Sequence, residues 1–93
     1  MEIRIDPHTL TRAEERGTDE AEIKDTITNG FSIAAKYGRL GKAKIYEFKQ
    51  ERLGQYYEHK RVEVIYALEE EVADTVTVYV FYGTWEAENG DSV

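Results

Sequence analysis

Three basic side chains recur at a four-residue spacing near the start of the sequence. His8, Arg12 and Arg16 lie in the segment HTLTRAEERG. Because four residues advance a helix by about 400°, these side chains would line one face of a helix. An imidazole and two guanidinium groups in a row are hydrogen-bond donors suited to phosphate or carboxylate. The alternative is a solvated face, in which Arg12 pairs with Glu15 or Glu20 and Arg16 complements the helix dipole.

A second group of cations lies among aromatic residues in the middle of the chain. Cations bind phosphates and aromatic rings can stack unpaired bases, so this composition is compatible with RNA binding. Strands are rich in tyrosine in any case, and the alternative is that the rings pack in the core or across strands. The group consists of Lys42, Lys44, Lys49, Lys60 and Arg61, interleaved with Tyr37, Tyr46, Phe48, Tyr56 and Tyr57.

The sequence contains none of the common metal or cofactor motifs. The chain has no cysteine, which excludes disulfides and thiolate chemistry. The two histidines, His8 and His59, could act as base and acid, but they lie far apart in the sequence and lack the spacing of a ligand pair. There is no calcium loop, phosphate-binding glycine loop or serine elbow. We therefore expect no metal and no cofactor.

Length and charge restrict the classes of protein further. The chain has 93 residues, enough for one domain, and a net charge of −7. We expect a single domain over residues 1–83 and a polar, acidic, flexible tail over 84–93. The absence of a long apolar run and of a signal-peptide pattern predicts no membrane partner and a cytoplasmic location.

The charge is unevenly distributed along the chain. Residues 1–30 hold 8 acidic and 4 basic residues, residues 31–61 hold 3 and 8, and residues 62–93 hold 8 and none. A basic middle between acidic flanks could form a local positive patch that steers an anionic ligand. Alternatively, neighbouring strands neutralise one another across the sheet.

Capping residues predict two helices after a short strand over residues 2–5. Asp6 and Pro7 suit the start of a helix that ends near Arg16, where Gly17 is a natural C-terminal cap. Asp19 can cap a second helix, which Asn29-Gly30 closes.

After residue 30 the apolar period changes to two, which predicts strands. The segment Tyr79–Tyr82 is apolar at every position, as in a central strand covered on both faces. The fold class is therefore α+β: a strand, two helices, then an antiparallel meander of three or four strands packed on the helices. The expected strands cover residues 31–37, 42–49, 57–68 and 75–82, with a polar loop over 50–55 and a hairpin near Glu69–Glu71.

Together these features resemble the domain-of-unknown-function 4258 family. The resemblance rests on the pattern His8-x3-Arg12-x3-Arg16-Gly17, an acidic second helix ending at Asn29-Gly30, and apolar strand segments over 62–66 and 76–83. It covers roughly residues 3–83. Through its relation to the RelE/ParE-like group of small bacterial toxins, it implies a strand, two helices and a curved antiparallel sheet, and RNA cleavage without a metal. Members that cleave RNA are usually basic, whereas this chain is acidic.

The resemblance and the charge pattern suggest two main hypotheses for function, beside a third in which the chain is an inactive descendant that keeps only the fold. A metal-independent ribonuclease needs a base, an acid and cations that stabilise the phosphorane. The hypothesis assigns catalysis to His8, Arg12, Lys44 and Tyr79, and anion binding to Arg16, Lys42, Lys60 and Arg61. The alternative is a protein-binding module without catalytic activity, for a toxin, antitoxin, phage or host partner. If the His8–Arg12 face and the strand cations share one hollow, catalysis is favoured; if they point to separate surfaces, binding is favoured.

Overall fold

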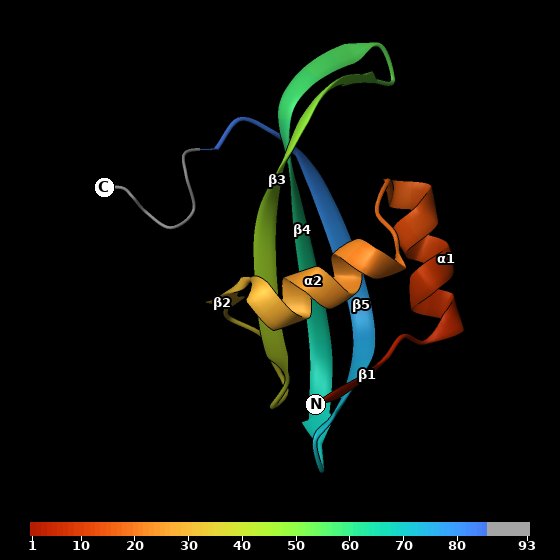
Figure 1. Cartoon of the computed structure of the whole chain (residues 1–93), viewed down its shortest axis with the longest axis vertical. Helices are drawn as coiled ribbons and strands as arrows, with labels where there is room; N and C mark the ends of the chain where they lie inside the picture. Colours follow the sequence, from red (N-terminus) through yellow and green to blue (C-terminus); the bar gives the residue numbers. More distant parts are fainter. Residues whose placement is uncertain (86–93) are drawn as a thin grey trace.

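The computed structural model describes residues 1–85 as an α+β fold in which two helices pack on one face of a mixed sheet (Figure 1). None of the described helices is both long and apolar enough to cross a membrane. The predicted tail lies outside the described residues from position 86 onward. The elements in chain order are β1 (Glu2–Arg4), α1 (Pro7–Arg16), α2 (Glu20–Asn29), β2 (Phe31–Ile33), β3 (Leu40–Arg52), β4 (Gln55–Glu69) and β5 (Val72–Gly83).

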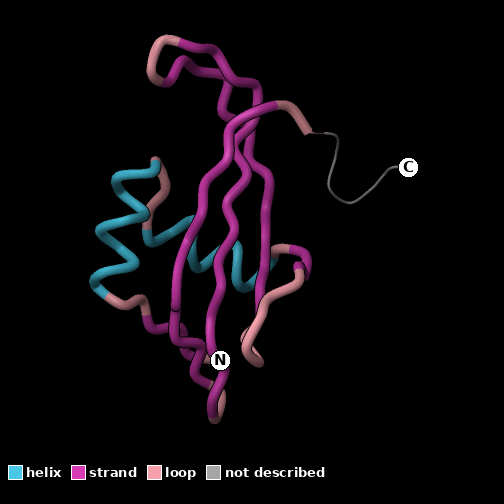
Figure 2. The backbone as a smooth tube through the Cα atoms, turned by 180° about the vertical axis from the view of Figure 1, so that it is seen from behind, coloured by secondary structure: helices cyan, strands magenta, loops and turns pink. Residues whose placement is uncertain are grey.

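The five strands form one sheet in the order β1-β5-β4-β3-β2. Strands β2 to β5 pair antiparallel, as the meander predicted, and β1 joins the sheet parallel to β5 at residues 72–74. Both helices lie on the same side, and the view from behind shows strands with no helix across them (Figure 2). We call the covered side the helix face and the opposite side the outer face.

The predicted caps define both helices. Asp6 accepts a hydrogen bond from the backbone N–H of His8, and Pro7 occupies the first turn of α1. Gly17 ends α1 with φ of 98°, a left-handed conformation that costs glycine little. Asp19 caps α2 by accepting from the N–H of Glu22. Local sequence therefore places both helix starts and the turn between them.

The core lies between the helices and the helix face. Alternate residues of β4 point inward, so that Val62 and Val64 are fully buried against Ile23 of α2 and Ala13 of α1. Helix α1 lies beside β5, and the Arg16 guanidinium donates to the backbone oxygen of Val78 (2.6 Å). Strand β1 pairs with β5 only at residues 72–74. Helix α1 lies beside the remaining edge of β5, which reduces its access to a strand of another chain.

Two predictions about where the strands end were wrong. Strand β2 ends at Ile33 rather than 37, because residues 34–39 form the connection to β3. The expected loop over residues 50–55 is mostly strand, because a two-residue turn at Leu53 and Gly54 closes the β3–β4 hairpin. Both turn residues have positive φ (54° and 82°), the conformation that matches the twist of paired strands.

The prediction for Tyr79–Tyr82 was also wrong. Beyond Asp74 strand β5 has no strand on one side, and no described helix covers its outer face. Tyr79 and Phe81 are consequently 43% and 47% exposed, while Val78 between the sheet and the helices is buried. One face of this segment is covered and the other is open.

Candidate functional site

The residues predicted to bind anions or act in catalysis lie on three separate surfaces. The side chains of Lys42 and Lys44 on β3 and of Lys60 on β4 project to the helix face, because side chains alternate along a strand. Arg61 and Tyr79 belong to the outer face, where Arg61 is paired with Phe81 and Tyr79 with Glu63. His8, Arg12 and Arg16 lie along α1.

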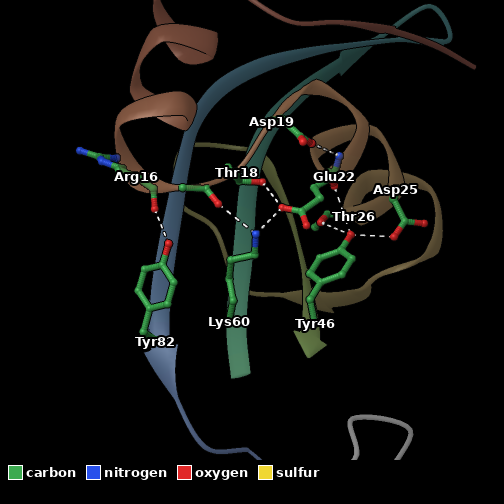
Figure 3. Close-up of polar contacts among 10 residues, drawn as sticks. Arg16, Thr18, Asp19, Glu22, Asp25, Thr26, Tyr46, Lys60 and Tyr82 are labelled. Atoms are coloured by element: carbon green, nitrogen blue, oxygen red, sulfur yellow. Dashed lines mark hydrogen bonds and ion pairs between the residues drawn. The ribbon is translucent and has the colours of Figure 1, made fainter. Parts of the chain in front are cut away.

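Lys60 is part of the structural support of the loop between the helices (Figure 3). Its side chain is buried, and its Nζ donates to the backbone oxygen of Gly17 (2.9 Å) and to Oε1 of Glu22 (2.8 Å). Thr18 also donates to that Glu22 oxygen (2.7 Å). These bonds satisfy a half-buried carbonyl group at the end of α1 and a half-buried carboxylate of α2.

Two further side chains from the sheet hold the end of α1. The Tyr82 hydroxyl donates to the Arg16 backbone oxygen (2.7 Å), as Figure 3 shows, and Arg52 donates to that of Glu15 (3.1 Å). Burial raises the pKa of Tyr82, so the hydroxyl stays protonated and able to donate. Cations near the C-terminus of a helix also complement its dipole.

Lys44 belongs to a polar cluster between β3 and α2. Its Nζ and the Tyr46 hydroxyl both lie 2.6 Å from Oδ2 of Asp25, and Asn29 donates to Oδ1 (2.7 Å). The hydrogen bond from Lys44, followed by those from Tyr46 and Asn29, lowers the pKa of Asp25 to about 2. Burial and the bond to Asp25 raise the pKa of Tyr46. Lys44 therefore already has an anionic partner.

The cations of α1 differ in exposure along the helix. His8 and Arg12 are exposed, and no ion pair of Arg12 with Glu15 or Glu20 occurs in the described part of the chain. Arg16 is half-buried, and its guanidinium lies 5.8 Å from the centroid of the Tyr79 ring. The α1 cations thus approach the outer face only at Arg16.

Lys42 is half-buried on β3 and makes no described ion pair.

The outer face presents a cluster of rings around an ion pair. We call this cluster the outer patch; it consists of Phe31, Arg61, Glu63, Tyr79 and Phe81. Nε of Arg61 lies 2.8 Å from Oε2 of Glu63, and its guanidinium lies 5.3 Å from the centroid of Phe31. The rings of Tyr79 and Phe81 stack with centroids 6.3 Å apart. The patch is apolar and aromatic with a neutralised centre.

Three members of the outer patch were not in the predicted site. Glu63 lies two residues from Arg61 on the same strand and therefore on the same face. Only the pairing of β2 to β5 places Phe31 and Phe81 beside Arg61. The uninterrupted apolar segment around Tyr79 was the sequence feature that could have indicated this patch. A strand with one solvent-facing side needs apolar residues only at alternate positions, and this segment has them at every position.

His59 lies at one end of the outer face. Its Nδ1 accepts a hydrogen bond from the backbone N–H of Trp85 (3.1 Å), and the Trp85 ring packs beside Gly83. This contact holds the last described residues against the sheet. His8 lies on α1, so the two histidines belong to different surfaces.

The described residues therefore offer separate binding surfaces. No group of three metal-ligating side chains occurs among residues 1–85. Lys44, Lys60 and Arg61 are each paired with a carboxylate. The arrangement can bind through exposed rings on the outer face and through the free cations of α1.

Comparison with known proteins places the chain in a family. The model of a domain of unknown function, DUF4258, matches residues 5–80, which include both helices, the outer patch except Phe81, and most of the sheet. The chain belongs to the DUF4258 family. No curated protein and no solved structure matches it. The α+β architecture described above is thus the architecture of this DUF4258 chain.

Proposed function

We propose that this DUF4258 protein is a protein-binding module and that the outer patch is its docking surface. The observation that carries the proposal is the exposure of Tyr79 and Phe81 (43% and 47%) on a face that no described helix covers. A contiguous exposed apolar patch is typical of an interaction site. Aromatic residues are the side chains on which binding energy most often concentrates.

The charge of the patch favours a protein over RNA as its partner. Phosphate binding depends on cations that are free to replace counterions. Arg61, which lies inside the patch, is neutralised by Glu63 at 2.8 Å. The chain as a whole carries −7, which repels a polyanion. An apolar surface with one internal ion pair resembles the centre of a protein interface.

Site-specific photo-crosslinking in the cells that make this protein tests the proposal. A photoreactive phenylalanine analogue replaces Tyr79 in one variant and Tyr37 in a matched control. Tyr37 is also exposed but lies in the loop before β3, away from the outer patch. We expect a protein adduct from position 79 and none from position 37. Equal adducts at both positions, or none from position 79, would overturn the proposal.

The second candidate is binding or cleavage of RNA, which the resemblance to ribonuclease toxins suggests. The supporting observation is the contact of Arg16 with Tyr79, which joins the α1 cations to stacked rings. In this scheme His8 is the base or acid, Arg12 stabilises charge, and the rings stack bases.

RNA binding across a salt series, together with cleavage of a mixed RNA, tests the second candidate. His8→Ala and Arg12→Ala are compared with the wild-type chain. Affinity that falls steeply with salt, and cleavage that both substitutions abolish, support it. Absence of binding at low salt, or equal cleavage by all three proteins, rejects it.

A further inference from the structure

We propose that the partner seated on the outer patch is a second copy of this chain, packed face to face. This inference rests on the proposed function and names its partner. The inference follows from how one cation, one anion and two rings are arranged on the outer patch. When two copies face each other, each of these groups can lie opposite a group that complements it. The decisive residues are Arg61, Glu63, Tyr79 and Phe81.

The strand register supplies this self-complementarity. Arg61 is paired with Phe81 and Glu63 with Tyr79, on either side of the pair Val62–Val80. A two-fold axis between two such sheets, crossing β4 at the level of Val62, exchanges the two positions. Each Arg61 then lies opposite the partner subunit's Glu63. A symmetric interface requires a surface that complements itself, and this patch does.

The same rotation matches the rings. Each Tyr79 lies against the partner subunit's Phe81, so that both exposed rings are covered. Aromatic pairs across packed sheets stabilise an interface beyond the area that they bury. The resulting assembly has two sheets in the middle and the helices outside, the aligned packing of a β-sandwich. It would cover the open side of the apolar segment around Tyr79.

The charge distribution directs two copies to this face. Each copy carries −7, and the end of β4 and the turn after it contain the acidic run Glu69, Glu70 and Glu71. Contact between two copies through this acidic run would oppose like charges, which disfavours association. The outer patch contains one Arg and one Glu, so contact there avoids this repulsion. The neutral patch on an acidic body therefore favours its own copy.

Sedimentation of the full chain between about 1 µM and about 1 mM measures the association, because weak and moderate interfaces dissociate in this range. We expect a concentration-dependent dimer. Phe81→Ala is expected to weaken it at least about tenfold by removing a ring from the interface centre. Arg39→Glu is the matched control for the charge reversal Arg61→Glu described below, because Arg39 is exposed in the loop before β3. A wild-type chain that stays monomeric throughout the range overturns the inference.

Charge exchange tests whether Arg61 and Glu63 lie at the centre of the interface. Arg61→Glu places two carboxylates, and Glu63→Arg two guanidinium groups, at the centre of the patch. Each variant alone is expected to be monomeric, with its circular dichroism spectrum reporting that it is folded. An equimolar mixture is expected to form a heterodimer with affinity within about threefold of the wild type, since opposite charges then face each other. A mixture that stays monomeric while the wild type dimerises overturns the placement of Arg61 and Glu63 in the interface.

The photo-crosslinking experiment separates this inference from the proposed function. If position 79 crosslinks to a different protein and the wild-type chain is monomeric, the docking function holds and the self-association fails. If the adduct has twice the mass of the chain, both hold. If position 79 yields no protein adduct in cells and the pure chain is monomeric, both fail.

Discussion

Replacing Lys60 with methionine tests whether this lysine is structural, as its contacts indicate, or binds anions, as the sequence suggested. Methionine keeps most of the apolar stem but removes both charge-assisted hydrogen bonds, to Gly17 and to Glu22. Breaking a buried pair by removing one partner costs about 3–5 kcal/mol. Lys60 is buried (8% exposed), but the Glu22 side chain is 25% exposed, so we expect a value near the lower end, about 3 kcal/mol. Urea unfolding followed by circular dichroism gives this difference.

Lys44→Met is the matched control for this prediction. Lys44 also projects toward the helix face and pairs with a carboxylate, but its side chain is 25% exposed. Its loss should cost only about 1 kcal/mol. Adding Glu22→Gln to Lys60→Met should recover about 1 kcal/mol, because it removes the half-buried, unpaired charge left behind. If Lys60→Met costs no more than Lys44→Met and instead abolishes RNA binding, the structural role is refuted.

Three further perturbations test other parts of the fold. The pKa of Asp25 is about 2 in the folded chain against an ordinary 3.8, so its ionised form stabilises the fold above pH ~4, and this stability is lost as pH falls through about 2. Asp25→Asn should remove about 1 kcal/mol of the pH dependence of the unfolding free energy after screening. The same dependence in wild type and variant between pH 5 and 2 would contradict this prediction. Gly17→Ala should cost about 2–3 kcal/mol in urea unfolding, because φ is 98° and the added Cβ would meet the Tyr82 hydroxyl; a loss below about 0.5 kcal/mol would be inconsistent with this turn. Leu53→Asn should raise the midpoint of thermal unfolding, stabilising by about 0.5–1 kcal/mol, because Leu53 is 95% exposed at φ of 54°, where asparagine is preferred; a lowered midpoint would argue against the turn at Leu53 and Gly54.

Many features of the fold could be predicted because they depend on local interactions. Asp6, Pro7, Gly17 and Asp19 set the helix boundaries through bonds to residues no more than four positions away. The alternation along β4 predicted strand structure in the same way, since its period is a property of the backbone. The strand ends near residues 37 and 50 were missed because pairing partners, which are distant in sequence, decide where a strand stops.

The candidate site depended much more on tertiary structure. Residue type alone made Lys44, Lys60 and Arg61 look like anion-binding groups, since each carries a free charge in an unfolded chain. Folding supplies each with a carboxylate: Asp25, Glu22 and Glu63 respectively. That list of pairs could not be derived from the sequence, because two of the three join residues 19 and 38 positions apart.

By itself, the sequence determined the two capped helices, the α+β class and the apolar character of the segment around Tyr79, because caps and periodicity act over a few residues. The tertiary structure alone decided which sheet face is left open and which cations are neutralised. Both depend on strand order and register, which are set by the packing of the whole chain. The exposed rings of Tyr79 and Phe81 result from the two together: an apolar strand, and a fold that places both helices on its other side.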